Sequence, residues 1–319
     1  MKFTVFCSSA LLAAAASVVS VAVANDTFEG NVVKKPFAAA KSGSKTSSTQ
    51  ILYHGGPILN QSNSVYVIYY GTFPSTTQPI INDFLVGLNA SQQYGVNSSY
   101  NIPNVAQSTI PGTYAFVAPA AAPAKNPSGS VYWDSYSHGT QLSNSSVPAI
   151  VSHAIAGGLP ANENGIYLVV TAPNVKIAGF CNSFCAYHTS STTIYNGLHI
   201  RYALIPDPTQ KCSACNGGFA VYGDTVTPNN DFGADTMVDD IVHELSETVT
   251  DPDISAWYTQ SGAEDGDLCN YVYDTPKPSL VKTVIVDGST AHYNATLNGR
   301  NFLIQLIWKN SGTGYCAAQ

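Results

Sequence analysis

Acidic residues are concentrated in one part of this 319-residue chain, and their clustering constrains the fold more than any other feature. Eleven of the 20 Asp and Glu residues lie between Asp231 and Asp267, and no Lys or Arg lies among them. Carboxylates at this density repel one another unless water, protons or a bound cation compensates their charge. We therefore expect this segment to fold around a metal ion.

The same segment contains the clearest helical pattern of the chain. Asp235 is a candidate cap at its start, and Pro252 limits the helix at its end. His243 and Glu247 are four residues apart, so their side chains lie one turn apart at a separation that suits two ligands of one zinc ion. The apolar residues recur at intervals of three, four and seven and form one face: Val238, Ile241, Val242, Leu245 and Val249.

Residues 243–247 read His-Glu-Leu-Ser-Glu and resemble the zincin motif His-Glu-x-x-His. In that motif two histidines bind zinc, and the glutamate activates the metal-bound water. We therefore predict that His243 and Glu247 bind Zn²⁺ and that Glu244 acts as the general base. A carboxylate in place of the second histidine makes the bound water less acidic. The third ligand is expected from Glu264 or Asp267, which follow Glu247 by 17 and 20 residues, as in thermolysin-like enzymes.

Other interpretations of this segment stay open. Asp253 falls where the longer metzincin motif has its third ligand, but Thr250 replaces the glycine of that motif. Ca²⁺ is the alternative ion, because oxygen ligands alone would satisfy it, and the candidates are Asp251, Asp253, Glu264, Asp265 and Asp267. The polar helix face is also typical of a solvated surface, and its residues are Asp239, Asp240, His243, Glu247 and Thr250.

His188 is a further catalytic candidate for the same cleft. It follows Cys185 by three residues and could donate a hydrogen bond to a transition state, although a structural histidine beside a disulfide is the more frequent case. A peptide substrate is expected along a strand edge near Tyr187 and His188. The motifs of serine hydrolases, P-loop proteins and dinucleotide-binding proteins are absent from the sequence, so those chemistries are not supported.

The N-terminal residues have the pattern of a secretory signal peptide, residues 1–24. Lys2 precedes an apolar stretch over residues 11–23, and Ala22-Val23-Ala24 matches a small-x-small cleavage site. No later run reaches the ~18 apolar residues of a membrane span. We expect a secreted, extracellular protein with a flexible leader at residues 25–50 and one domain at residues 51–319. The net charge of −7 disfavours nucleic acid as a partner.

Cysteines and glycosylation sequons agree with export. Cys7 leaves with the signal peptide, and the other six of the seven cysteines predict three disulfides. Spacing groups them as Cys181 with Cys185, Cys212 with Cys215, and Cys269 with Cys316, but six cysteines allow 15 pairings and the sequence does not choose. Sequons predict glycans on surface loops and begin at Asn25, Asn60, Asn89, Asn97, Asn144 and Asn294.

Strand and helix patterns alternate over residues 51–319 without an internal repeat. Strands are expected at residues 64–73, 166–170, 199–205, 281–286 and 302–308. Helices are expected near residues 80–88 and 150–155, in addition to the zincin-like active-site helix. This pattern predicts an α+β fold, in which a single disulfide-stapled domain contains a mixed sheet.

Short segments from residue 51 to the C-terminus carry a family resemblance. They are Tyr53–Leu59, Val65–Phe73, Phe180–His188, Cys212 with Cys215, Pro228–Asp231, Asp251-Pro252 and Tyr293–Arg300. In this order they resemble the EXORDIUM / phosphate-induced protein 1 family, and the chain is identified as a microbial-type member with a zincin-like His-Glu-x-x-Glu segment. The resemblance implies an extracellular protein that is associated in plants with the cell wall and growth control, and it supplies no biochemical activity.

Two functions are therefore expected. The first is a secreted zinc-dependent hydrolase, similar to a peptidase, that acts on a peptide. The second is a non-catalytic protein that binds a cell-wall component or a receptor and holds a structural ion. In the second case the binding surface would contain exposed aromatic residues such as Trp133 and Trp257.

Overall fold

The computed structural model of the chain describes residues 31–32, 50–119, 126–209, 212–275 and 278–318. The predicted signal peptide lies outside these residues, as does the predicted leader apart from residues 31, 32 and 50. Among the described residues, no helix combines the length and apolar character that a bilayer span requires.

A six-stranded mixed sheet organises the molecule, with strand order β1-β8-β9-β6-β3-β4. Four neighbouring strands run parallel, and they are β3 (Ser64–Tyr70), β4 (Val131–Asp134), β6 (Gly165–Thr171) and β9 (Leu198–Pro206). On the other side of β9 lies β8 (Tyr187–Tyr195), which is antiparallel to it. The short strand β1 (Asn31–Val32) pairs with β8 in antiparallel register, with Asn31 opposite His188.

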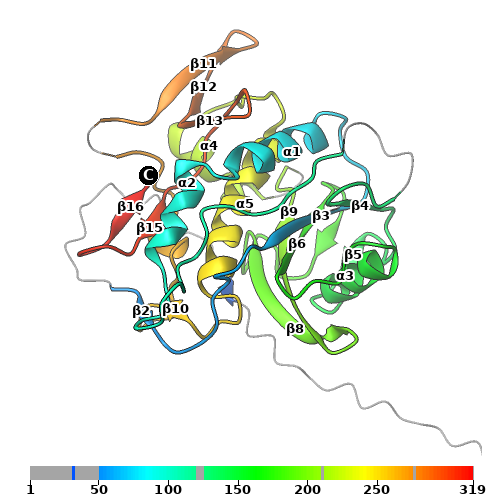
Figure 1. Ribbon diagram of the computed structural model, residues 1–319. Helices are drawn as coiled ribbons and strands as arrows, with labels where there is room; N and C mark the ends of the chain where they lie inside the picture. The colour runs from blue at the N-terminus through cyan, green and yellow to red at the C-terminus, as the bar shows by residue number, and fades with distance from the viewer. Residues whose placement is uncertain (1–30, 33–49, 120–125, 210–211, 276–277, 319) are drawn as a thin grey trace, which may run out of the picture.

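Helices cover both faces of this sheet (Figure 1). Side chains of β3 point alternately to the two faces, so that Val67 packs in one apolar cluster and Ile68 in the other. The first cluster includes residues of α1 (Thr77–Leu88) and α5 (Phe232–Thr250), and the second includes residues of α3 (Ser146–Ala156). The strands β3 and β6 are therefore buried on both sides, as their continuous apolar sequences require.

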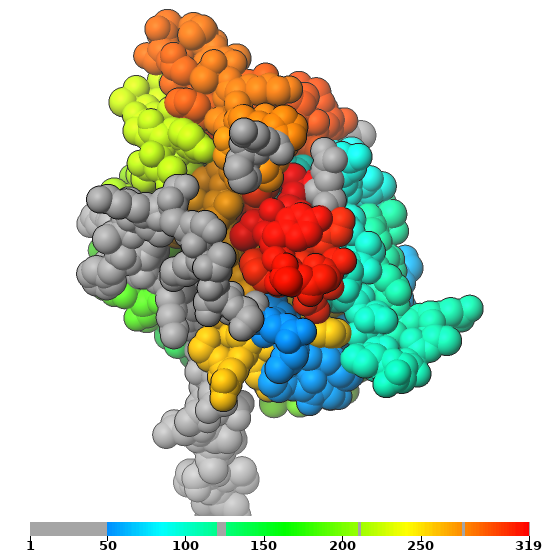
Figure 2. Space-filling model, turned by 90° about the vertical axis from the view of Figure 1, so that its left-hand side faces the viewer, coloured from blue at the N-terminus to red at the C-terminus, as the bar shows by residue number. Residues whose placement is uncertain are grey.

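Shorter elements surround the sheet and its helices. The two-stranded ribbons pair β2 (Leu52–Tyr53) with β10 (Trp257–Tyr258), β5 (Gln141–Leu142) with β7 (Lys176–Ile177), β11 (Lys282–Val286) with β12 (Ser289–Tyr293), β13 (Ala295–Leu297) with β14 (Arg300–Phe302), and β15 (Ile307–Lys309) with β16 (Tyr315–Ala317). Short helical segments are α2 (Gln92–Gly95), η1 (Val96–Ser99), η2 (Ser213–Cys215), α4 (Gly217–Tyr222) and η3 (Asp267–Cys269). Figure 2 shows the C-terminal residues, in red, exposed on one face of the molecule.

Three disulfides staple the described fold: Cys181–Cys212, Cys185–Cys215 and Cys269–Cys316. The first two cross between the two cysteine groups that spacing suggested, and together they tie the segment before β8 to η2. The third ties η3 to β16. The α+β class, the mixed sheet and the three disulfides are thus confirmed.

Some details differ from the expectations. Asp231, rather than Asp235, caps α5 by accepting a hydrogen bond from the amide of Ala234 at 3.0 Å. The expected strand at 302–308 is broken between β14 and β15. The sequon residue Asn97 is fully buried in η1, so the expectation of a surface loop is wrong there. The polar strand β8 had no apolar pattern to predict it.

Candidate metal centre

The predicted metal-binding helix is α5, which lies in the centre of the molecule (Figure 1). Its capping residue Asp231 also accepts hydrogen bonds from the hydroxyls of Thr76 and Thr77, which fixes α5 against the start of α1. His243 is only 2% exposed and Glu247 only 1%. The interpretation of this helix face as a solvated surface is therefore wrong, because the sheet and the segments after α5 enclose the helix.

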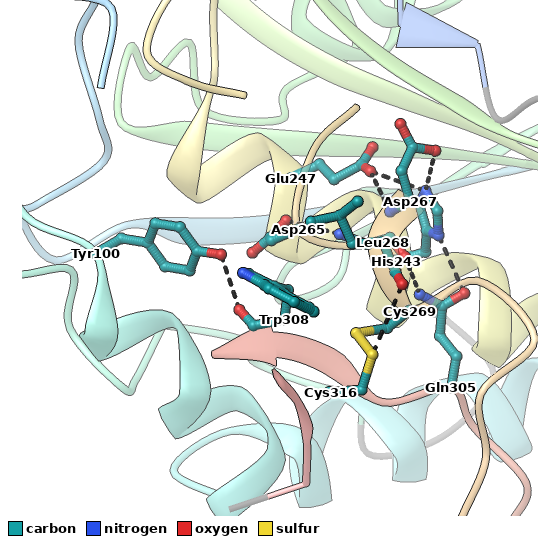
Figure 3. Close-up of a disulfide and its surroundings, with 11 residues drawn as sticks. Tyr100, His243, Glu247, Asp265, Asp267, Leu268, Cys269, Gln305, Trp308 and Cys316 are labelled. Carbon is teal, nitrogen blue, oxygen red and sulfur yellow. Dashed lines mark hydrogen bonds and ion pairs between the residues drawn. A yellow bond between two sulfur atoms is a disulfide. The ribbon is translucent and has the colours of Figure 1, made fainter. Parts of the chain in front are cut away.

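One group of donor atoms joins α5 to the start of η3. Nε2 of His243 lies 3.0 Å from Oε1 of Glu247 and 3.9 Å from Oδ1 of Asp267. The amide of Asp267 donates a hydrogen bond to the same Oε1 at 3.1 Å, which fixes the approach of the loop. Figure 3 shows these three side chains pointing toward one another. All three offer a ligand atom within 4.8 Å of the others, so they form a possible metal site.

A second group of donor atoms joins α5 to β8 and shares Glu247 with the first. Nε2 of His188 lies 3.6 Å from Oε2 of Glu247. His188, Glu244 and Glu247 offer ligand atoms within 4.8 Å of one another. Glu264 lies on this side of the centre, with its Oε2 at 3.4 Å from Nε2 of His188. Glu247 therefore faces one imidazole with each of its two oxygens.

Gln305 orients His243 from the side away from the carboxylates (Figure 3). Its side-chain nitrogen donates to the carbonyl of Gly266 at 2.9 Å, so its Oε1 is left to accept from Nδ1 of His243 at 3.1 Å. This contact places a proton on Nδ1, so that Nε2, which faces Glu247 and Asp267, is the ring nitrogen that could bind a metal ion. Gln305 belongs to none of the sequence motifs described above.

Gly266 allows the loop to approach the helix closely. A Cβ atom at this position would lie 2.9 Å from Oε1 of Glu247 and 2.9 Å from Cγ of His243. Such distances are too short for non-bonded carbon contacts, so a larger residue would push the loop that carries Asp267 away from α5. A glycine next to Asp267 is therefore required by the packing of the site.

Burial dominates the electrostatics of the centre. It raises the pKa of Glu244 and of Asp265 well above the ordinary value of a carboxyl group. It lowers the pKa of His188 to about 4, so that this imidazole is neutral near pH 7. Burial also opposes a charge on His243, but the Glu247 carboxylate outweighs it and raises the pKa of His243. The nearby Arg201 is bound to Asp253 at 3.1 Å instead of to these carboxylates.

Glu244 is the clearest sign that the centre fits a cation. Its side chain is 0% exposed, and neither of its carboxylate oxygens has a hydrogen-bond partner among the described residues. An ionised carboxylate in such a place costs several kcal/mol unless a positive charge or hydrogen-bond donors compensate it. The donor set of imidazoles and carboxylates suits Zn²⁺.

The other candidate residues are placed as follows. The carboxylate of Asp253 pairs with Arg201 and lies 3.2 Å from His199. These contacts do not favour Asp253 as the third metal ligand of a metzincin-like motif. One oxygen of Asp251 accepts hydrogen bonds from the amides of Ser255 and Ala256. Asp251 also interacts with Glu264 and Glu247, so it lies beside the donor groups described above, whereas Asp253 is held by Arg201 and His199.

The expected aromatic binding surface is not present at the two tryptophans. Trp257 is only 8% exposed and packs between Tyr53 and Tyr100, with ring centroids 5.4 and 5.5 Å away. Trp133 is partly buried and packs against the core beside Tyr69. Both side chains belong to the core, as is common for aromatic residues.

Comparison with known proteins identifies the relatives of the chain. A family model described as "Phosphate-induced protein 1 conserved region" matches residues 51–319. Protein EXORDIUM-like 3 of Arabidopsis thaliana is 29% identical over 88% of this chain and 86% of its own length. Protein EXORDIUM-like 5 of the same plant is 30% identical, over 80% and 74%. Protein PHOSPHATE-INDUCED 1 of Nicotiana tabacum is 29% identical, over 83% and 87%. No solved structure matches the chain.

Proposed function

This chain belongs to the phosphate-induced protein 1 family, and we propose that it is a secreted, zinc-dependent hydrolase of peptides. The observation that carries the proposal is the convergence of His243, Glu247 and Asp267. Ligand atoms around a tetrahedral zinc ion lie about 3.3–3.6 Å apart, given bonds of about 2.0–2.2 Å. The separations of 3.0 and 3.9 Å bracket this range, so small side-chain movements would complete the site.

The residues around the ion have complementary roles in this proposal. A bound zinc ion would polarise the substrate carbonyl and lower the pKa of its bound water. Glu244 follows His243 directly on α5, and its carboxylate accepts the proton of the attacking water. Its raised pKa, which burial causes, suits a group that must hold that proton before passing it on. Gln305 keeps Nε2 of His243 directed at the ion.

Peptides are the proposed substrate class because of the strand β8. His188 belongs to β8 and faces Glu247 and Glu264, so a chain paired with β8 at this point runs beside the donor groups. The pairing of Asn31–Val32 with Tyr187 and His188 supplies an example of an extended segment on that strand. Antiparallel addition to a sheet edge is a common mode of peptide binding.

A second candidate function is a non-catalytic extracellular protein with a structural metal ion. It is favoured by the enclosure of the centre, since His188, Glu244 and Glu264 are 0% exposed and only the Asp267 side chain is substantially exposed, at 24%. Closed sites are typical of structural ions, whereas catalytic ions keep an open position. In this case the partner is a cell-wall component or a receptor, and Ca²⁺ is the alternative ion.

The experiment combines metal analysis with a hydrolysis assay on the secreted full-length protein. Bound metals are measured by mass spectrometry, and cleavage is followed with a library of fluorescence-quenched peptides. The Glu244→Gln variant is expected to keep the ion held by His243, Glu247 and Asp267 and to lose at least 100-fold in activity. The control variant, Glu163→Gln, changes an exposed glutamate and should behave as the wild type. A bound ion without hydrolysis supports the second candidate, and a protein that binds no ion refutes both.

A further inference from the structure

We propose that the centre binds two divalent cations, the second one held by His188, Glu244 and Glu247, and that Glu247 bridges them. This inference rests on the proposed function, because the first cation is the one held by His243, Glu247 and Asp267. The two donor groups share Glu247 and no other residue. A centre for one ion would gather its donors around a single point, whereas these donors surround two points.

The bridging geometry is visible in the two oxygens of Glu247. Oε1 lies 3.0 Å from Nε2 of His243, and Oε2 lies 3.6 Å from Nε2 of His188. Each oxygen of Glu247 thus faces a different imidazole. Paired metal ions in hydrolytic enzymes lie about 3.5–4 Å apart, which is a distance that a single carboxylate can span.

The second donor group has the dimensions of a metal site. The separation of 3.6 Å between His188 and Glu247 falls at the about 3.3–3.6 Å expected between ligands of a tetrahedral ion. Nε2 of His188 is also the atom that faces Glu264 at 3.4 Å, so a further carboxylate is within reach.

Glu244 provides an independent observation for the second cation. It is completely buried, it is part of the second donor group, and both of its oxygens are without a hydrogen-bond partner among the described residues. The first donor group leaves this carboxylate uncompensated. One of its oxygens suffices for the second cation, and the other remains available to take the proton of the attacking water.

The negative charge of the centre also favours two cations. The two groups and the adjoining Glu264 and Asp265 contain five carboxylates and two imidazoles. A single divalent cation balances two negative charges, whereas two cations balance four. With two cations, the centre would clamp the attacking water and the peptide carbonyl between the ions.

Zinc stoichiometry tests this proposal. The full-length protein is loaded with Zn²⁺, dialysed and analysed by mass spectrometry, and we expect two ions per chain. The His188→Gln variant should retain one ion. His199→Gln is the matched control, because His199 is a partly exposed histidine on the neighbouring strand β9 that contacts Asp253, and it should retain two ions. One ion per wild-type chain overturns the second site and leaves the proposed function standing, whereas no bound ion overturns both.

A spectroscopic measurement does not depend on the folding of any variant. Loading the wild-type protein with Mn²⁺ should give the exchange-coupled paramagnetic resonance spectrum of two ions that share a carboxylate. A spectrum of isolated Mn²⁺ ions at saturation would exclude the bridge by Glu247 and so overturn the proposal. Hydrolysis assays are not needed for either readout, so the two-cation centre and the peptidase activity are tested separately.

Discussion

Replacement of Gln305 by leucine tests how the fold positions the proposed metal centre, because Gln305 contacts a proposed ligand and is not itself one. Its side chain is 3% exposed and makes hydrogen bonds to His243 at 3.1 Å and to the carbonyl of Gly266 at 2.9 Å. Gln305→Leu leaves Nδ1 of His243 without a partner, whereas the carbonyl of Gly266 keeps the hydrogen bond that the amide of Cys269 donates to it at 3.1 Å. An unpaired buried group costs about 1–3 kcal/mol, so the free energy of unfolding of the metal-free protein should fall by roughly that amount.

The same substitution is expected to weaken zinc binding. Without an acceptor at Nδ1, the imidazole of His243 can rotate or change tautomer, and Nε2 no longer presents its lone pair to the ion. Loss of such an outer contact typically reduces metal affinity by ~10–100-fold. Gln305→Glu is the matched control, because it keeps the acceptor for His243 and loses only the donor to Gly266. Its zinc affinity should equal or exceed that of the wild type.

The assay is a zinc titration in competition with a chromophoric chelator, combined with urea-induced unfolding in EDTA. The two measurements separate affinity from stability. If Gln305→Leu is folded by circular dichroism and binds zinc within threefold of the wild type, the positioning role of Gln305 is refuted. If Gln305→Glu loses as much affinity as Gln305→Leu, the acceptor at Nδ1 is not the cause.

Three further predictions concern metal removal, pH and glycosylation. EDTA should lower the midpoint of thermal unfolding, measured by calorimetry, by about 8–16 °C. An ion at 1,000 times its Kd contributes about 4.1 kcal/mol, and the midpoint of a domain of this size shifts by about 2–4 °C per kcal/mol. The His243→Gln variant should show no such shift. Burial raises the pKa of Asp235 from 3.8 to about 6. The protonated carboxyl therefore stabilises the fold fully below pH 3.8, and about 3 kcal/mol of this stability is lost as the pH rises through 6. The free energy of urea-induced unfolding should depend less on pH in Asp235→Asn. Exposed Asn144 should carry a glycan after secretion from eukaryotic cells, whereas buried Asn97 should not, and glycopeptide mass spectrometry on either residue checks this.

The sequence predicts α5 well because its apolar periodicity and its charge pattern point to the same element. His243 and Glu247 lie on one side of a helix wherever that helix is placed, so their separation of 3.0 Å follows from local geometry. Asp267 depends on tertiary structure, but it lies only 20 residues after Glu247, and a short connection favours proximity in space. The apolar and charge pattern of α5 does not reveal which segments cover its polar face. The interpretation of that face as a solvated surface therefore stayed open.

The elements that complete the centre have weaker sequence signals. The strand β8 contains the polar run Thr189–Thr193, which lacks the alternation of a half-buried strand. The sequence offered His188 as a candidate for the same cleft, but it did not predict the strand that brings Nε2 of His188 to 3.6 Å from Glu247. Gln305 interrupts an otherwise apolar stretch, Leu303–Ile307, and this is the one signal that could have identified it. A polar residue in such a stretch needs a buried partner, but the sequence does not say that the partner is 62 residues earlier.

The enclosure of the centre and the strand β1 both limit how a substrate would reach the proposed ion. Nearly all proposed ligands are 0–2% exposed, and Asp267 is the exception. Backbone groups of β8 at Tyr187 and His188 are already paired with Asn31 and Val32. A peptide that binds β8 at this point must therefore displace Asn31 and Val32, because each strand edge pairs with one partner at a time. Competition with Asn31 and Val32 should then slow hydrolysis without abolishing it, whereas zinc binding, which needs no peptide, should be unaffected.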